Sequence, residues 1–186
     1  MIVESWPWKR DLAQRAEAIR RRKQQRRWSE GSFAALERDI FQSAYAVRKL
    51  MEAGKISDEV ESSSLKATVH KPHGRAVDIM NRHRFDELYD LSRGSPGDIP
   101  LRDFCNQVIH SFVFSPAIEK GGALAGIFVA SDREKGRRLR YFDVDTVIDA
   151  LVRVAEDDIV SWRGEREKVS GEVKITRKSN SLEAET

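Results

Sequence analysis

The sequence predicts an α+β fold, mainly a helical bundle that carries a β-hairpin or a small antiparallel sheet. Two observations lead to this expectation. Apolar residues recur at intervals of three and four in several long segments, which is the spacing of amphipathic helices. An apolar run at 123–130 and an alternating segment at 138–144 flank a charged turn, which is typical of a hairpin. With 186 residues, the chain is long enough for one well-packed domain and short for two large ones.

The first thirty residues are the most unevenly charged part of the chain. They contain nine basic residues and four acidic ones, a local surplus of five, whereas the whole chain carries only +3. Trp8, Leu12, Ala16 and Ile19 follow helical spacing, so residues 1–28 are predicted to form a basic N-terminal helix. The cations at its end are candidates for contacts with nucleic-acid phosphates or with an acidic protein. These candidates are Arg20, Arg21, Arg22, Lys23, Arg26 and Arg27. The alternative is a solvated helix end whose cations favour the helix dipole.

Residues 29–175 are predicted to form a single α+β domain. A long helix is expected over 33–51, with Ser29 or Ser32 as its cap and Gly54 after its end. Alternating apolar residues predict a short strand at 65–69, and a short helix is expected near 85–91. Two glycines and two prolines predict that 93–100 is a loop.

The segment 101–112 is predicted to be an amphipathic helix that holds the candidate functional residues. Its apolar stripe is formed by Leu101, Phe104, Cys105, Val108, Ile109 and Phe112. Arg102, Asn106 and His110 recur at steps of four along the margin of this stripe. A cation, an amide and an imidazole in one line can hold a phosphate and move a proton. The simpler interpretation is that these polar groups only satisfy neighbouring backbone.

The C-terminal third of the chain continues the alternation of strands and helices. After the hairpin, Asp143 or Asp145 is expected to cap a helix over 144–155. A last strand is predicted around 169–175. Residues 176–186 lack a core pattern and are predicted to be a disordered tail.

The run Cys105-Asn-Gln-Val-Ile-His110 resembles the signature of HEPN domains, helical modules widespread in bacterial toxin and defence systems. In that signature an Arg is usually followed by Asn, and His comes four residues after the Asn. Asn106 and His110 match, whereas Cys105 stands where the family keeps its catalytic Arg. In active members the resemblance implies a metal-independent ribonuclease site shared across a dimer, with the His assisting proton transfer and the Arg steadying the phosphate.

The resemblance therefore implies a catalytically degenerate domain that binds RNA or a partner protein, with a homodimer formed through the 101–112 helix. One alternative is a non-enzymatic interaction or regulatory module whose Asn106 and His110 are structural. Another is a metal-independent endoribonuclease that uses Arg102 and His110. The sequence leaves open whether the protein is an enzyme, and the loss of the motif Arg favours a binding role.

Several other classes of function find no support in the sequence. His70 and His73 are a weak pair without further ligands at zinc spacing, so no metal site or cofactor is expected. The single cysteine excludes an intramolecular disulfide. The longest apolar run, 121–130, is too short to span a bilayer as a helix, and the chain does not start with an apolar secretion signal. We therefore expect no membrane contact and a cytoplasmic location.

Overall fold

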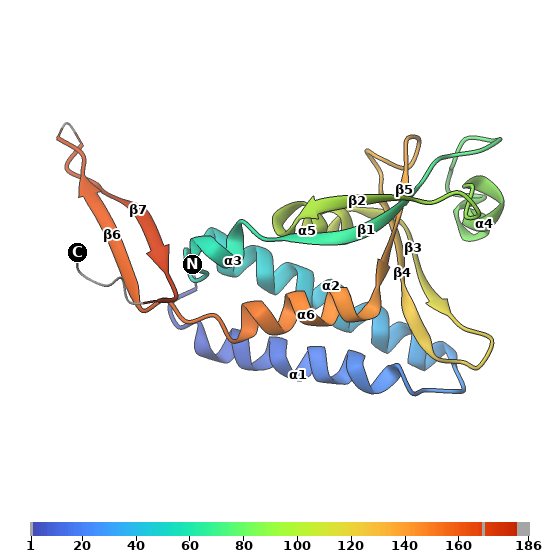
Figure 1. The fold of residues 1–186 in the computed structure, drawn as a ribbon, viewed down its shortest axis with the longest axis horizontal. Coiled ribbons are helices and arrows are strands. Elements are labelled where there is room, and N and C mark those ends of the chain that lie inside the picture. The colour runs from blue at the N-terminus through green and yellow to red at the C-terminus, as the bar shows by residue number, and fades with distance from the viewer. Residues whose placement is uncertain (1, 169, 182–186) are drawn as a thin grey trace.

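The fold contains more sheet than the sequence predicts. The computed structural model describes residues 2–168 and 170–181. In this part of the chain, five strands form an antiparallel sheet in the order β2-β1-β5-β4-β3, and β6 and β7 form a separate hairpin (Figure 1). The strands are β1 (Ser64–His70), β2 (Ser95–Pro100), β3 (Ser111–Ile118), β4 (Leu124–Ser131), β5 (Leu139–Asp143), β6 (Ser161–Arg166) and β7 (Val173–Ser179). The α+β class is right, but the expectation of a mainly helical bundle is wrong, because the five-stranded sheet dominates the fold.

The helices follow the predicted periodicity closely. Ser29 caps α2 by accepting a hydrogen bond from the Ser32 N–H, and Asp143 caps α6 by accepting one from the Asp145 N–H. Each is one of the two candidate caps that the sequence offers for its helix. The long helices are α1 (Trp6–Arg22), α2 (Glu30–Glu52), α5 (Leu101–Ile109) and α6 (Val144–Ala155), and the short ones are α3 (Asp58–Glu61), η1 (Arg82–Arg84) and α4 (Phe85–Leu88).

Two strands explain the difference from the predicted bundle. The segment 93–100, predicted as a loop, contains β2, which pairs with β1 from Ser64↔Pro100 to Val69↔Ser95. Its prolines are tolerated because β2 is an edge strand, where one row of backbone groups has no partner strand. β3 pairs with β4 and begins at Ser111, so the predicted helix over 101–112 is shorter than expected.

One face of the sheet is covered by α5 and α6. Phe104 on α5 meets Phe142 on β5 edge to face, with ring centroids 4.9 Å apart. α1 and α2 pack behind these helices, and Leu12, Ala16 and Ile19 of α1 are fully buried in the same core. The basic N-terminal helix is therefore part of the main core, and the predicted boundary at residue 28 falls in the connection between α1 and α2.

The opposite face of the sheet supports a second, smaller core beneath the segment 71–94. Successive residues of β4 alternate between the two cores. Ile127 and Val129 pack in the main core, and Phe128 and Ala130 pack in the smaller one. A sheet covered on both faces needs strands that are apolar on both sides. This requirement explains the nearly continuous apolar run of β4.

The β6–β7 hairpin projects from the end of the molecule where α1 begins (Figure 1). Hydrogen bonds fix its base to the body: the Lys178 N–H donates to Asp58, the Lys178 ammonium to Glu61, the Ser179 hydroxyl to Glu59, and the Asn180 amide to Asp157. The tail predicted from residue 176 thus starts inside β7. Residues 182–186 of that prediction, and residue 169 of the strand predicted at 169–175, lie outside the described residues.

Candidate functional site

The motif residues Asn106 and His110 lie at the end of α5. His110 is the closing residue of this helix, and its N–H donates to the Asn106 carbonyl. Asn106 is half-buried and His110 is exposed. Neither side chain makes a hydrogen bond or ion pair with a residue that the structure describes. Asn106 and His110 are therefore open to a ligand, but neither of them lines any of the four cavities described for this part of the chain.

Arg102 is held away from His110 by an ion pair. Its guanidinium donates to Glu61 on α3, and the Lys178 ammonium binds the other oxygen of the same carboxylate. Although burial opposes it, hydrogen bonds from Lys178 and Arg102 hold the pKa of Glu61 below its usual value. Arg102 and His110 are also eight residues apart, about 12 Å along a helix axis. The structure thus does not bring Arg102 and His110 to one place.

Cys105, at the position of the motif Arg, is part of the core. Its side chain is fully buried, and burial raises the pKa of its thiol to about 12. α5 lies between the sheet and α2, so the surface left for a dimer contact is the narrow polar edge of Asp103, Asn106 and His110. Dimerisation through the 101–112 segment stays a prediction.

The six candidate cations at the end of α1 fall into two groups. Arg20 pairs with Glu17, Arg22 with the buried Asp39, and Lys23 with Asp145. These three residues link elements of the fold or neutralise a neighbour. The second group has no ion pair with any described residue, and its side chains are exposed. It consists of Arg21, Arg26 and Arg27.

The connection between α1 and α2 is held in a fixed path. The indole N–H of Trp28 donates to the Gly122 carbonyl over 2.7 Å, and a side chain at Gly122 would collide with the Arg26 carbonyl. Beside this connection lies a polar hollow of about 520 Å³. Arg21, Arg22 and the first turn of α2 line it, so two arginine side chains and the start of a helix border the same space.

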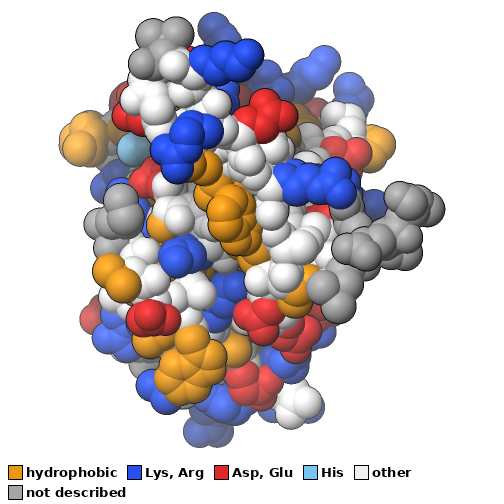
Figure 2. Space-filling view, turned by 90° about the vertical axis from the view of Figure 1, so that its left-hand side faces the viewer, with side chains coloured by type: hydrophobic (Ala, Val, Ile, Leu, Met, Phe, Trp, Pro, Cys, Tyr) orange, Lys and Arg blue, Asp and Glu red, His pale blue; other side chains and the backbone are white. Residues whose placement is uncertain are grey.

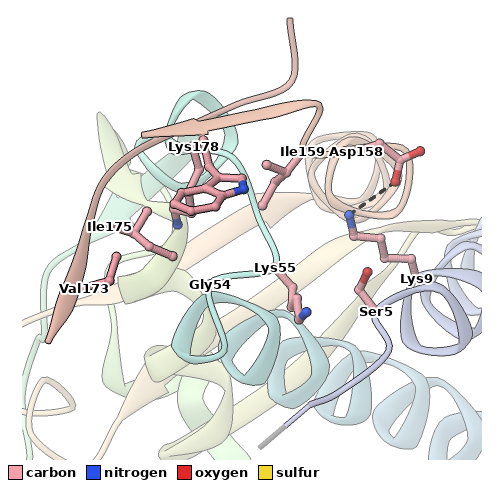
Figure 3. A pocket seen from close by; sticks show the side chains of 10 residues that line it. Ser5, Lys9, Gly54, Lys55, Asp158, Ile159, Val173, Ile175 and Lys178 are labelled. Atoms are coloured by element: carbon pink, nitrogen blue, oxygen red, sulfur yellow. Dashed lines mark ion pairs between the residues drawn. The ribbon is translucent and has the colours of Figure 1, made fainter. Parts of the chain in front are cut away.

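A second concave region, which sequence reasoning missed, lies beneath the β6–β7 hairpin. It has a volume of about 490 Å³ and is framed by the start of α1, the loop after α2 and the hairpin (Figure 3). Apolar side chains from β6 and β7 line it together with three lysines: Lys9 on α1, Lys55 in the loop after α2, and Lys178 on β7 itself. Figure 2 shows this end of the molecule, where a strip of hydrophobic side chains has Lys and Arg side chains on both sides. The only sequence signal was a tryptophan and two aliphatic residues in an otherwise charged segment.

The described residues give little support to metal binding or to membrane insertion. His70 is buried, and its Nδ1 lies 3.1 Å from the Asp90 carbonyl, which is a structural contact. No three His, Cys, Asp or Glu side chains gather as metal ligands in the described ranges, so His70 and His73 do not complete a zinc site there. None of the helices described here is both long and apolar enough to cross a membrane.

The comparisons with known proteins returned no match. No family model, no curated protein and no solved structure is significantly similar to this chain.

Proposed function

We propose that the protein binds RNA without cleaving it, through the arginine-rich connection between α1 and α2. The observation that carries the proposal is the group of Arg21, Arg26 and Arg27, which are exposed and lack acidic partners among the described residues. One guanidinium group can donate two parallel hydrogen bonds to a phosphate. Three such groups therefore form a surface that binds the RNA backbone whatever its base sequence.

The surroundings of these arginines favour a phosphate over a carboxylate-rich protein. The hollow beside them takes in the start of α2, and the positive end of this long helix attracts anions. Glu30, the acidic residue of that first turn, is not among its lining residues. The contact between Gly122 and the Arg26 backbone reduces the entropy lost when a ligand is bound.

Binding rather than cleavage is proposed because the parts of a ribonuclease site are separated. Arg102 is engaged by Glu61, Cys105 is buried, and His110 is exposed at the end of α5. Neither Arg102 nor Cys105 is therefore placed to stabilise, beside His110, the charge that develops on a phosphate during cleavage. Kinship with HEPN domains stays part of the proposal and rests on Asn106 and His110.

The test is a titration of a fluorescently labelled single-stranded RNA with the full chain at several salt concentrations. Removal of the 1–28 segment is unsuitable, because α1 contributes to the core. We therefore compare wild type with the triple variant Arg21→Gln, Arg26→Gln and Arg27→Gln. Loss of three phosphate contacts should weaken binding at least about tenfold and reduce the slope of log K against log salt by about 2. The wild-type protein should leave the RNA intact.

A second triple variant, Arg75→Gln, Arg133→Gln and Arg137→Gln, is the matched control. It removes the same charge from exposed arginines that also lack ion pairs with described residues. If both variants lose the same RNA affinity, the effect is one of net charge alone, and the proposed RNA surface at Arg21, Arg26 and Arg27 is contradicted. Cleavage of the RNA that disappears in His110→Ala would show that the chain is a ribonuclease after all.

A further inference from the structure

The pocket beneath the β6–β7 hairpin contains one lysine that the fold does not use. Lys9 binds the Asp157 carbonyl and lies 3.7 Å from the Asp158 carboxylate, and Lys178 is bound by Asp58 and Glu61. Lys55 makes no ion pair with a described residue. Figure 3 shows it extending from the loop after α2 toward the start of α1. Lys55 is thus the cation that is available to an anionic ligand.

The hairpin contributes exposed apolar side chains to the same pocket as this lysine. Trp162, Ile175 and Val173 line the pocket, yet 63%, 52% and 49% of their surfaces are exposed. Gly164 leaves room for these side chains, because a side chain there would lie 3.1 Å from both the Trp162 ring and Val173. A two-stranded ribbon gains little stability alone, so apolar groups left this open are available to cover a ligand.

The pocket is held open before any ligand arrives. Lys178, Ser179 and Asn180 tie the base of the hairpin to α3 and to Asp157. Asp157 in turn accepts hydrogen bonds from the Ser57 N–H and hydroxyl at 2.7 and 2.6 Å. Because these groups are already ordered, binding does not have to order the hairpin base.

We propose that this pocket binds a small aromatic anion: a flat ring placed against Trp162, with a phosphate or carboxylate group at Lys55. A nucleoside monophosphate has this chemistry, and the volume of about 490 Å³ lies in the range of small-molecule sites. Charge complementarity selects an anion, and the indole selects a planar group over an aliphatic chain. The site is independent of the proposed RNA surface, which lies at the other end of α1.

The test follows the Trp162 indole N–H by NMR while AMP is added to the full-length protein. Trp162→Phe identifies the signal among the four tryptophans. We expect a saturable shift with Kd below about 1 mM. Adenosine, which lacks the anion, and inorganic phosphate, which lacks the ring, should each bind at least about tenfold more weakly.

Variants separate the two halves of the proposal. Lys55→Ala and Lys55→Gln should each weaken AMP binding about tenfold or more, whereas Lys120→Ala, an exposed lysine in another loop, should leave it unchanged. Trp162→Ala should weaken binding, and Trp162→Phe should restore most of it because it keeps a flat ring. Circular dichroism confirms that each variant is folded.

Three outcomes would overturn the proposal: no shift with AMP, equal binding of AMP and adenosine, or no effect of Lys55→Gln. The same titration with an aromatic carboxylate, and with an RNA that carries a 5′-phosphate, shows which kind of aromatic anion the pocket binds. Failure here is distinguishable from failure of the proposed RNA binding, because the RNA titration depends on Arg21, Arg26 and Arg27 and should not respond to Lys55→Gln.

Discussion

The polar edge of α5 and the pocket beneath the β6–β7 hairpin differ in how their residues come together. Arg102, Asn106 and His110 are close in the sequence and follow one helix, yet none of them lines a cavity described above. The pocket takes Lys55 and Trp162 from segments more than a hundred residues apart. Regular spacing on one element therefore places groups in a line, whereas a ligand-sized space needs several elements that converge.

The buried side of α5 contributes in a different way from its edge. Leu101, Phe104, Cys105 and Val108 are at most 1% exposed and join the sheet to α2. The regular spacing of this segment is explained by packing, with the polar residues occupying what remains. The comparison implies that the buried side of α5 provides stability and that the proposed ligand sites lie elsewhere in the fold.

The largest effect is expected from Phe104→Ala. This substitution leaves a cavity against Phe142 and should lower the free energy of unfolding by about 3–5 kcal/mol, measured by urea denaturation. His110→Ala on the same helix is the control and should change it by less than about 0.5 kcal/mol, because its side chain is exposed. A large loss of stability in His110→Ala would show that the polar edge of α5 also has a structural role, and the contrast between its two sides would fail.

A smaller but more local effect is expected from Asp157→Ala. The change leaves the Ser57 N–H and hydroxyl without their partner, which should cost about 2–3 kcal/mol. It also frees Asn180, so amide hydrogen exchange should rise in β7 and AMP binding should weaken. Asp158→Ala, the exposed neighbour, should leave stability within about 0.5 kcal/mol. Unchanged exchange in β7 would contradict the anchoring of the hairpin through Asp157.

The elements that the sequence predicts well are those whose signals are local. α2 and α6 have a helical apolar period and a capping side chain next to their first turn, and β4 and β5 have apolar runs on both sides of a charged turn. β2 has no alternation and exists because β1 offers it an edge. β3 is likewise set by pairing with β4, which is why the predicted helix was drawn three residues too long.

The candidate site depends even more on distant partners. Glu61 decides the direction of Arg102, and Asp39 and Asp145 decide which candidate cations are engaged. None of these pairings has a signature in the sequence, because each joins segments that are brought together only by the packed core. For the same reason the pocket beneath the hairpin could not be predicted from the spacing of its residues.

The smallest expected effect is a change in the free energy of unfolding with pH, and it tests whether Cys105 lies in the core or at the exposed polar edge of α5. Burial raises the pKa of its thiol from an ordinary 9.0 to about 12, so the unfolded chain loses this proton at lower pH than the folded protein does. Between these two values, each rise in pH favours the unfolded state. At pH 10 this difference should lower the free energy of unfolding by about 1.4 kcal/mol relative to pH 8.

The measurement compares urea denaturation of wild type and Cys105→Ala at both pH values. Tyr89, whose pKa burial also raises to about 12, contributes equally to both proteins and cancels. Wild type should therefore lose more stability than the variant between pH 8 and 10. If the two lose the same amount, the thiol is already accessible in the folded state. The position of the motif Arg would then face solvent, and the separation of packing from binding on α5 would have to be abandoned.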